Sequence, residues 1–253
     1  MSYWRPPPEL SLRVAPVAVP TRLLALETSG DPLSIALGED GQLRGFVLLG
    51  EPRVHDRMAA ELIRRLLEDC RVHPEELDAV ALSAGPGSFT GLRIGASLAK
   101  GLCFRSPPVL VPVPTLEAFA EAAAPFVSRL GGRQILVCTP GHIQESAQNV
   151  EGWLFVQRFS PDGTALGSVH RCSLSELAPE PDTFVCGPAA PWIPGGLRLP
   201  CLERLSAELI LQAGYRRYQR GHRADPATFV PFYALDFQPG SSGSSRPLPP
   251  LTP

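Results

Sequence analysis

A glycine-rich segment in the first half of the sequence constrains the fold more than any other feature. Residues 85–95 read GPGSFTGLRIG. They follow residues 78–84, an apolar run that predicts a buried strand, and they lead into residues 92–104, which predict a helix. Glycines allow a tight turn and the close approach of a ligand or of another backbone. A strand, such a turn and a helix in this order are typical of an α/β protein.

The rest of the sequence predicts two halves of similar organisation. Short apolar or alternating runs predict an antiparallel meander at residues 23–26, 33–37 and 43–49, then an amphipathic helix capped by Asp56, a strand at 109–113 and a helix at 116–126. The second half predicts strands at 134–138, 153–159, 166–171 and 183–186 and a helix at 203–220. The same order in both halves predicts a duplicated, two-lobed α/β fold.

The predicted lobes lie between two segments of biased composition. We place the first lobe at residues 21–108 and the second at residues 109–235. Proline-rich residues 1–20 predict a disordered leader, and residues 236–253, rich in glycine, serine and proline, predict a disordered tail. Proline or charge interrupts every apolar run before the roughly 18 to 20 residues that a membrane span needs. We therefore expect a cytoplasmic protein that does not contact the membrane.

Charge and cysteine usage exclude further classes of function. The formal net charge is -2 and the sequence pI is about 6.2, so no overall positive field holds a nucleic-acid backbone. The six cysteines form no CxxC pair, which argues against zinc and for reduced core thiols. The five histidines are isolated along the sequence. We therefore predict neither a metal site nor a catalytic residue.

The glycine-rich segment could hold an anion, because a helix N-terminus carries partial positive charge and free N–H groups. The candidate ligand-binding residues are Glu27, Thr28, Ser29, Gly85, Gly87, Ser88, Thr90 and Arg93. The segment matches neither the dinucleotide-binding nor the P-loop pattern. It also lacks the GxSxG frame around Ser88, so we do not expect Ser88 to be a nucleophile.

The same glycines have a purely structural interpretation. Gly91, Gly95 and Ala99 are spaced by four and would form a small-residue stripe that packs closely on a neighbouring element. Arg93 would then be a solvated or ion-paired helix residue. The spacing alone does not decide between ligand binding and packing.

The motif at residues 85–95 resembles the hallmark of the TsaB (YeaZ) family. Residues 24–29 resemble the opening strand and acid-Thr turn of that family, His55 precedes the first helix as a histidine often does there, and residues 112–116 resemble its strand-to-helix junction. The resemblance implies an actin-like, sugar-kinase-like (ASKHA, ribonuclease H-like) fold. It also implies a part in making threonylcarbamoyladenosine in tRNA.

In that family the chain is a non-catalytic platform. The related TsaD subunit carries the metal and transfers the threonylcarbamoyl group, and the ATPase TsaE joins the pair, so tRNA would be contacted only through the complex. The family pairs through its two first-lobe helices. The interface residues that this implies here are His55, Met58, Leu62, Ile63, Leu66, Leu98 and Leu102. They would contact TsaD or, without it, a second copy in a homodimer; the alternative is that they pack only on the sheet.

The second lobe departs from the family pattern of Asp-Ala-Arg followed by Gly-Glu-Val-Tyr. Residues 138–142 read CTPGH and residues 151–155 read EGWLF. The aspartate that could order a metal-bound phosphate is missing. No cofactor is therefore predicted firmly, and weak ATP or ADP binding at the interlobe or subunit interface stays open.

Three rival functions remain. One is a self-sufficient ATP-binding enzyme of the sugar-kinase class that uses Glu27, Thr28 and Gly87, and another is an inactive glycoprotease-like homologue. The third is auxiliary tRNA binding by a basic run near the end of the last helix. That run comprises Arg216, Arg217, Arg220, His222 and Arg223.

Overall fold

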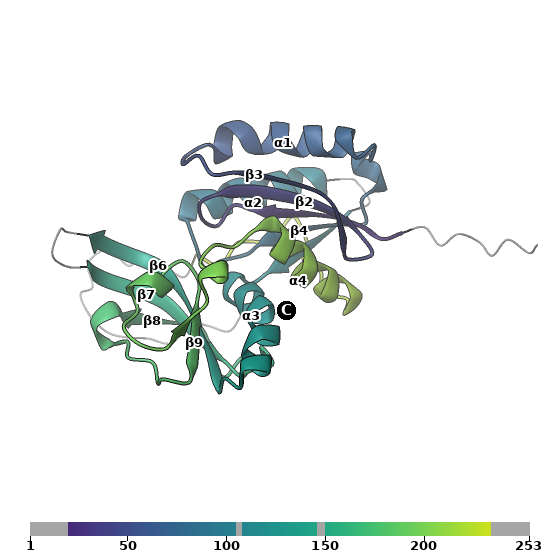
Figure 1. Cartoon of the computed structure of the whole chain (residues 1–253). Coiled ribbons are helices and arrows are strands. Elements are labelled where there is room, and N and C mark those ends of the chain that lie inside the picture. Colours follow the sequence, from purple (N-terminus) through teal and green to yellow (C-terminus); the bar gives the residue numbers. More distant parts are fainter. Residues whose placement is uncertain (1–19, 105–107, 146–149, 234–253) are drawn as a thin grey trace, which may run out of the picture.

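The computed structural model describes residues 20–104, 108–145 and 150–233 (Figure 1). The predicted leader, except for Pro20, and the predicted tail lie outside these residues. The strands are β1 (Arg22–Glu27), β2 (Leu33–Glu39), β3 (Gln42–Leu49), β4 (Ala79–Ser83), β5 (Val109–Val113), β6 (Gln134–Glu145), β7 (Val150–Phe159), β8 (His170–Ser173), β9 (Thr183–Cys186) and β10 (Leu197–Arg198). The α-helices are α1 (His55–Asp69), α2 (Phe89–Leu102), α3 (Thr115–Leu130) and α4 (Ala207–Gln219).

The first sheet has the strand order β3-β2-β1-β4-β5. The predicted meander β1–β2–β3 is antiparallel, and β4 and β5 continue the sheet parallel to β1. Alternate residues of β1 face opposite sides of the sheet, as the twofold period of a strand requires. Leu24 and Leu26 pack in the core under α1 and α2, whereas Leu23 and Ala25 pack in the core that contains α4. Helices therefore cover both faces.

The second sheet repeats this topology. Its order is β10-β9-β6-β7-β8, so the first strand again lies at the centre, with the antiparallel meander on one side and two parallel strands on the other. The predicted duplicated, ASKHA-type α/β fold is confirmed. In the first lobe the meander is followed by the helices α1 and α2. In the second lobe the short 3₁₀ turns η2 (Leu174–Glu176) and η3 (Ala190–Trp192) take the place of these helices.

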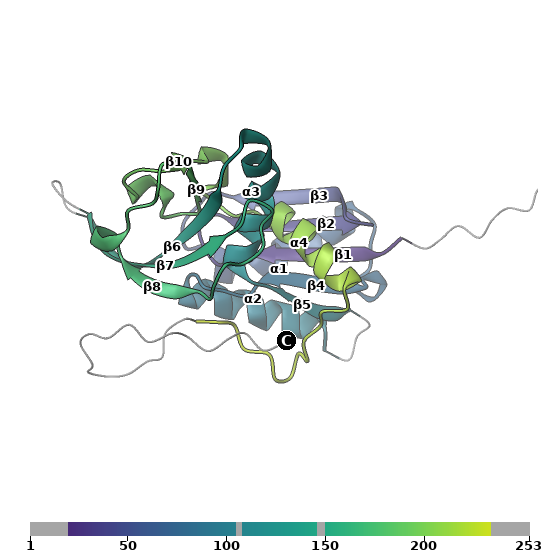
Figure 2. The ribbon, with the colours of Figure 1, turned by 90° about the horizontal axis from the view of Figure 1, so that it is seen from below.

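Two helices join the lobes (Figure 2). Helix α3 packs on the second sheet and α4 returns to pack on the first sheet, so the two helices lie side by side between the sheets. One hydrophobic core contains residues from both sheets and both helices, with Phe119 and Ile210 fully buried. After α4 the chain crosses the first lobe again, where Ala224 pairs with Leu110 of β5.

Several predicted boundaries differ from the structure. Strand β5 belongs to the first sheet, whereas the sequence analysis began the second lobe at residue 109. Asp56 is not the cap of α1, because the cap position is Val54 and Asp56 lies in the first turn. Strand β8 begins four residues later than predicted, and α4 begins at Ala207 because residues 200–202 form a separate 3₁₀ turn, η4 (Pro200–Leu202). None of the described helices is long and apolar enough to cross a membrane.

Candidate functional site

The glycine-rich turn lies where the parallel strands β1 and β4 end. Helix α2 starts at Phe89, directly after the turn, and the Ser88 side chain caps it by accepting a hydrogen bond from the Gly91 N–H at 3.2 Å. The turn is therefore the whole connection between β4 and α2.

The glycines of α2 bring the helix into contact with the chain's own β1–β2 turn. A methyl group at Gly91 would lie 1.9 Å from the Thr28 carbonyl oxygen, and one at Gly95 would lie 2.3 Å from Thr28 Oγ1. A methyl group at Gly87 would lie 2.6 Å from the Ser29 carbonyl oxygen, and the Ser88 N–H donates to that oxygen at 2.7 Å. The close approach that these glycines permit is to Thr28 and Ser29, which fits the packing interpretation of the motif.

The opposite side of the turn is closed by two other segments. Gly85 has a φ of +99°, and a methyl group there would lie 2.1 Å from the Phe232 carbonyl oxygen. The Phe232 N–H donates to the Ala84 carbonyl oxygen at 2.7 Å, and Gly85 exchanges two hydrogen bonds with Thr115 at the start of α3. Residues 224–233, which we call the C-terminal strap, thus end on the glycine-rich turn.

A buried carboxyl group lies beneath the turn. Glu27, at the end of β1, is 1% exposed, and its Oε1 accepts hydrogen bonds from the Ser29 N–H and hydroxyl, both at 2.6 Å. Burial raises the pKa of this carboxyl above its ordinary value, and the bonds from Ser29 oppose that shift. Within the described residues, Glu27 Oε2, Thr28 Oγ1 and Ser83 Oγ have no hydrogen-bond partner of normal geometry.

Ser83 is a residue that the sequence analysis missed. Strands β1 and β4 pair in parallel with Leu26 opposite Leu82, so the next residues, Glu27 and Ser83, end neighbouring strands. The signal in the sequence was the position of Ser83 as the last residue of an apolar strand before the glycines.

The remaining candidate ligand residues lie on the outer side of the turn. Ser88, Thr90 and Arg93 are exposed, whereas Glu27, Thr28, Ser29 and Gly85 are buried and Gly87 is intermediate. The Arg93 guanidinium lies 5.4 Å from the centre of the Phe89 ring, and that ring contacts Tyr233 at 4.8 Å between centroids. The structure brings all eight candidates to one end of the first sheet, but the β1–β2 turn is enclosed by α2.

The predicted interface residues fall into two groups. Leu62, Ile63 and Leu66 are between 5% and 8% exposed and belong to the core beneath α1 and α2. His55 is also buried, and its Nε2 lies 3.0 Å from the Gly30 carbonyl oxygen. Met58, Leu98 and Leu102 are only partly buried and pack at the margin of this core. We call these three residues the α1–α2 surface.

The predicted basic run is neutralised in part. Arg216 pairs with Glu121, and Arg217 pairs with Glu117 at 3.1 Å. Arg223 lies over the Tyr218 ring, 5.6 Å from its centre. These contacts engage Arg216 and Arg217 within the protein, and auxiliary tRNA binding by the run stays a prediction.

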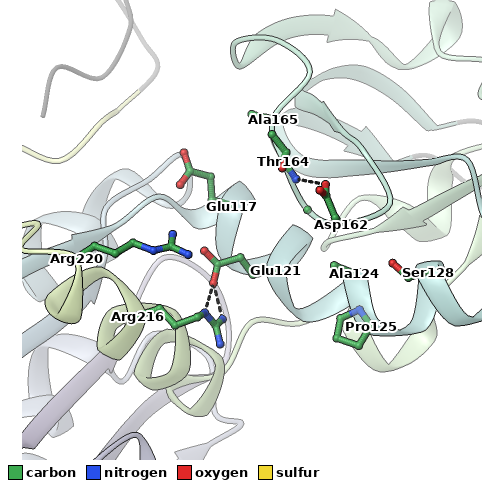
Figure 3. Close-up of a pocket in the computed structure, with 11 residues that line it drawn as sticks. Glu117, Glu121, Ala124, Pro125, Ser128, Asp162, Thr164, Ala165, Arg216 and Arg220 are labelled. Carbon is green, nitrogen blue, oxygen red and sulfur yellow. Dashed lines mark hydrogen bonds and ion pairs between the residues drawn. The ribbon is translucent and has the colours of Figure 1, made fainter.

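A cavity of about 610 Å³ lies beside these ion pairs, between the two lobes (Figure 3). It is lined by α3, by the loop between β7 and β8, and by the second half of α4. It does not include any residue of the glycine-rich turn. Among the residues that the structure describes, no group of three or more histidine, cysteine, aspartate or glutamate side chains could hold a metal ion.

Taken together, the two sheets of matching strand order, the crossing helices and the enclosed glycine-rich turn define a two-lobed protein of the ASKHA class. A model of the TsaD family, tRNA N6-adenosine threonylcarbamoyltransferase, matches residues 50–138. The tRNA threonylcarbamoyladenosine biosynthesis protein TsaB of Haemophilus influenzae is 38% identical over 101 residues, which cover 40% of this chain and 42% of that protein. The TsaB protein of Escherichia coli is 33% identical over 102 residues, which cover 40% and 44%.

The similarity in fold extends further than the similarity in sequence. A solved structure of YeaZ from Pseudomonas aeruginosa superposes with a TM-score of 0.67 at 23% identity and covers 84% of this chain and 99% of that one. A second Pseudomonas aeruginosa structure, described as similar to peptidase YeaZ, gives a TM-score of 0.69 at 24% identity with the same coverage. These matches confirm the resemblance to the TsaB (YeaZ) family. In sequence, the chain spans less than half the length of the curated TsaB proteins it matches.

Proposed function

We propose that this chain is a non-catalytic subunit of the machinery that makes threonylcarbamoyladenosine in tRNA, and that it pairs with a TsaD-like catalytic subunit in the cytoplasm. The observation that carries the proposal is the enclosed glycine-rich turn. The motif on which the family resemblance rests is used to pack α2 against the β1–β2 turn rather than to cradle a ligand. Its role is to fix the first-lobe helices in place, which suits a platform.

The α1–α2 surface supports the pairing. Met58, Leu98 and Leu102 keep part of their apolar area in contact with water, and both helices lie on the outside of the first sheet. The neighbouring Glu61, Arg64 and Arg65 form ion pairs among themselves, so they could border an apolar contact without leaving an unpaired charge. The surface would pack on a TsaD-like subunit or, in its absence, on a second copy, and a TsaE-like ATPase would join the pair.

The positions of Glu27, Thr28 and Gly87 argue against ATP chemistry by the isolated chain. Glu27 and Thr28 are 1% and 2% exposed, and Gly87 contacts Ser29 instead of facing an open site. The enclosed positions of Glu27, Thr28 and Gly87 do not fit a phosphate group, so no reaction step is assigned to these residues. Titration of the chain alone with ATP and magnesium should show neither micromolar binding nor turnover.

Reconstitution tests the proposed function. Threonylcarbamoyl transfer to tRNA would be measured with the catalytic and ATPase subunits of the same organism, with and without this chain. We expect transfer to depend on the chain and the chain alone to be inactive. Equal transfer in its absence would refute the proposal.

A pair of substitutions on α2 tests the pairing surface. Leu98→Asp places a charge on the half-buried apolar surface and should abolish copurification with the catalytic subunit. The matched control is Ser97→Asp, one residue earlier at an exposed position of the same helix, which should leave copurification unchanged. Circular dichroism would verify that both variants are folded. Full retention of the partner by folded Leu98→Asp would place the contact elsewhere.

A further inference from the structure

The cavity between the lobes has the volume of a small-molecule site. Its volume of about 610 Å³ falls within the roughly 300 to 1,000 Å³ that is usual for such sites. Helix α3 and the loop after β7 line it from one lobe, and α4, which packs on the other sheet, completes it (Figure 3). The Ser128 hydroxyl donates to the Pro161 carbonyl oxygen at 2.9 Å and ties the loop to α3. Packed elements therefore form the walls.

Two of the charged side chains that line the cavity have no ion-pair partner within the described residues. Glu121 is paired with Arg216, and Glu117 is paired with Arg217, which lies just outside the lining. Arg220 lines the cavity one helical turn beyond Arg216, and its guanidinium has no ion pair or hydrogen bond within the described residues. One positive charge on α4 is thus left without a partner.

One negative charge is left on the loop. Asp162 Oδ1 accepts hydrogen bonds from the Ser160 hydroxyl and from the Thr164 N–H, the latter at 3.1 Å. These bonds hold the pKa of the Asp162 carboxyl below its ordinary value, so it is ionised at neutral pH. Both donors are neutral, and Asp162 forms no ion pair within the described residues. Arg220 and Asp162 are both exposed side chains, and they present opposite charges without an ion-pair partner in the described residues to the same cavity.

The cavity is also lined by small apolar side chains. Ala124 and Pro125 of α3 and Ala165 of the loop line it. A ligand that pairs with both charges carries a carboxylate for Arg220 and an ammonium group for Asp162. A phosphate or a nucleotide would satisfy Arg220 but would offer no cation to Asp162. We propose that this cavity binds a free α-amino acid, held by Arg220 at its carboxylate and by Asp162 at its ammonium group.

Calorimetric titration of the full chain with the standard L-amino acids tests the proposal. The best-bound amino acid would be compared with its decarboxylated amine and with its deaminated carboxylic acid, each of which keeps one charge. Loss of charge-assisted hydrogen bonds should weaken either analogue by roughly 10-fold or more. No saturable binding of any amino acid, or an amine that binds as tightly as the amino acid, would overturn the proposal.

Variants assign the two ends of the ligand. Arg220→Gln should reduce amino-acid affinity to that of the amine and leave the melting temperature unchanged, because the native side chain makes no ion pair. Asp162→Asn, in which the amide oxygen can still accept from Thr164, should reduce it to that of the carboxylic acid. Arg129→Gln is the matched control, an exposed arginine on α3 outside the cavity lining. Unchanged affinity in Arg220→Gln would refute the assignment.

Discussion

Replacing Gly91 by alanine should loosen the joint between α2 and the first sheet. The added methyl group would lie 1.9 Å from the Thr28 carbonyl oxygen, whereas Cβ atoms essentially never approach another heavy atom within 3.0 Å. The added Cβ is fixed to the backbone of α2, and the atom it meets is a backbone oxygen of the β1–β2 turn. No side-chain rotation can relieve the contact, so the start of the helix must move.

The cost follows from that movement. Overpacking a well-packed site costs roughly 1 to 3 kcal/mol, and a contact between two backbones lies at the upper end. Alanine recovers up to about 1 kcal/mol through its higher helix propensity. The free energy of unfolding should therefore fall by about 2 kcal/mol, which for a domain of this size lowers the melting temperature by roughly 4 to 8 °C.

Gly101→Ala is the matched control on the same helix. Gly101 is exposed, its φ is not positive, and a methyl group there would have no neighbour within 4 Å. Only the higher helix propensity of alanine then acts, and the free energy of unfolding of the variant should exceed that of the parent by about 0.5 kcal/mol. Urea denaturation followed by circular dichroism would measure both variants. If Gly91→Ala were as stable as the parent, the account of the glycine-rich turn as a packing joint would be wrong.

Two further predictions concern residues around the same joint. Gly95→Ala brings a methyl group 2.3 Å from Thr28 Oγ1 and should lower the free energy of unfolding. The same substitution in a Thr28→Ala background should cost less, because the clashing oxygen is absent. If the two substitutions had additive effects on the free energy of unfolding in a double-mutant cycle, the contact would be contradicted. Burial raises the pKa of the Glu27 carboxyl above 4.5 in the folded state, so its contribution to stability is present below that pH and is lost as pH rises through the raised pKa. Glu27→Gln removes this titration and keeps an acceptor for Ser29. The stability of the variant relative to the parent, measured by urea titration, should therefore increase from pH 4 to pH 7. A difference in stability that does not depend on pH would refute the raised pKa.

The periodicity of apolar residues and the composition of the turns were sufficient to predict most strands of the first lobe. Strands β1, β2, β3 and β5 lie within two residues of their predicted positions, because alternating or continuous apolar runs end there at clear turn formers. Helix α2 begins three residues before the predicted start. Gly91 suggested a turn, but the helix tolerates it because Thr28 occupies the space of a side chain.

Contacts between distant residues could not be predicted in this way. The arginine run after Tyr215 looked like a solvated or tRNA-binding face, yet Glu121, 95 residues away from Arg216, neutralises part of it. The C-terminal strap contacts Ala84 and Gly85 through backbone atoms of Phe232, which carry no sequence signature. Both features depend on the way α4 crosses between the lobes.

The asymmetry of the duplicated fold bears on where a partner can bind. Both lobes have the same strand order, but only the first lobe has full helices on its outer face. In the second lobe, Leu174 of η2 and Ala190 of η3 are themselves buried in the core that covers that face. The partly buried Met58, Leu98 and Leu102 therefore lie on helices that have no counterpart in the second lobe. A subunit with a matching pair of first-lobe helices could pack on this face while the cavity between α3 and α4 stays free for its own ligand.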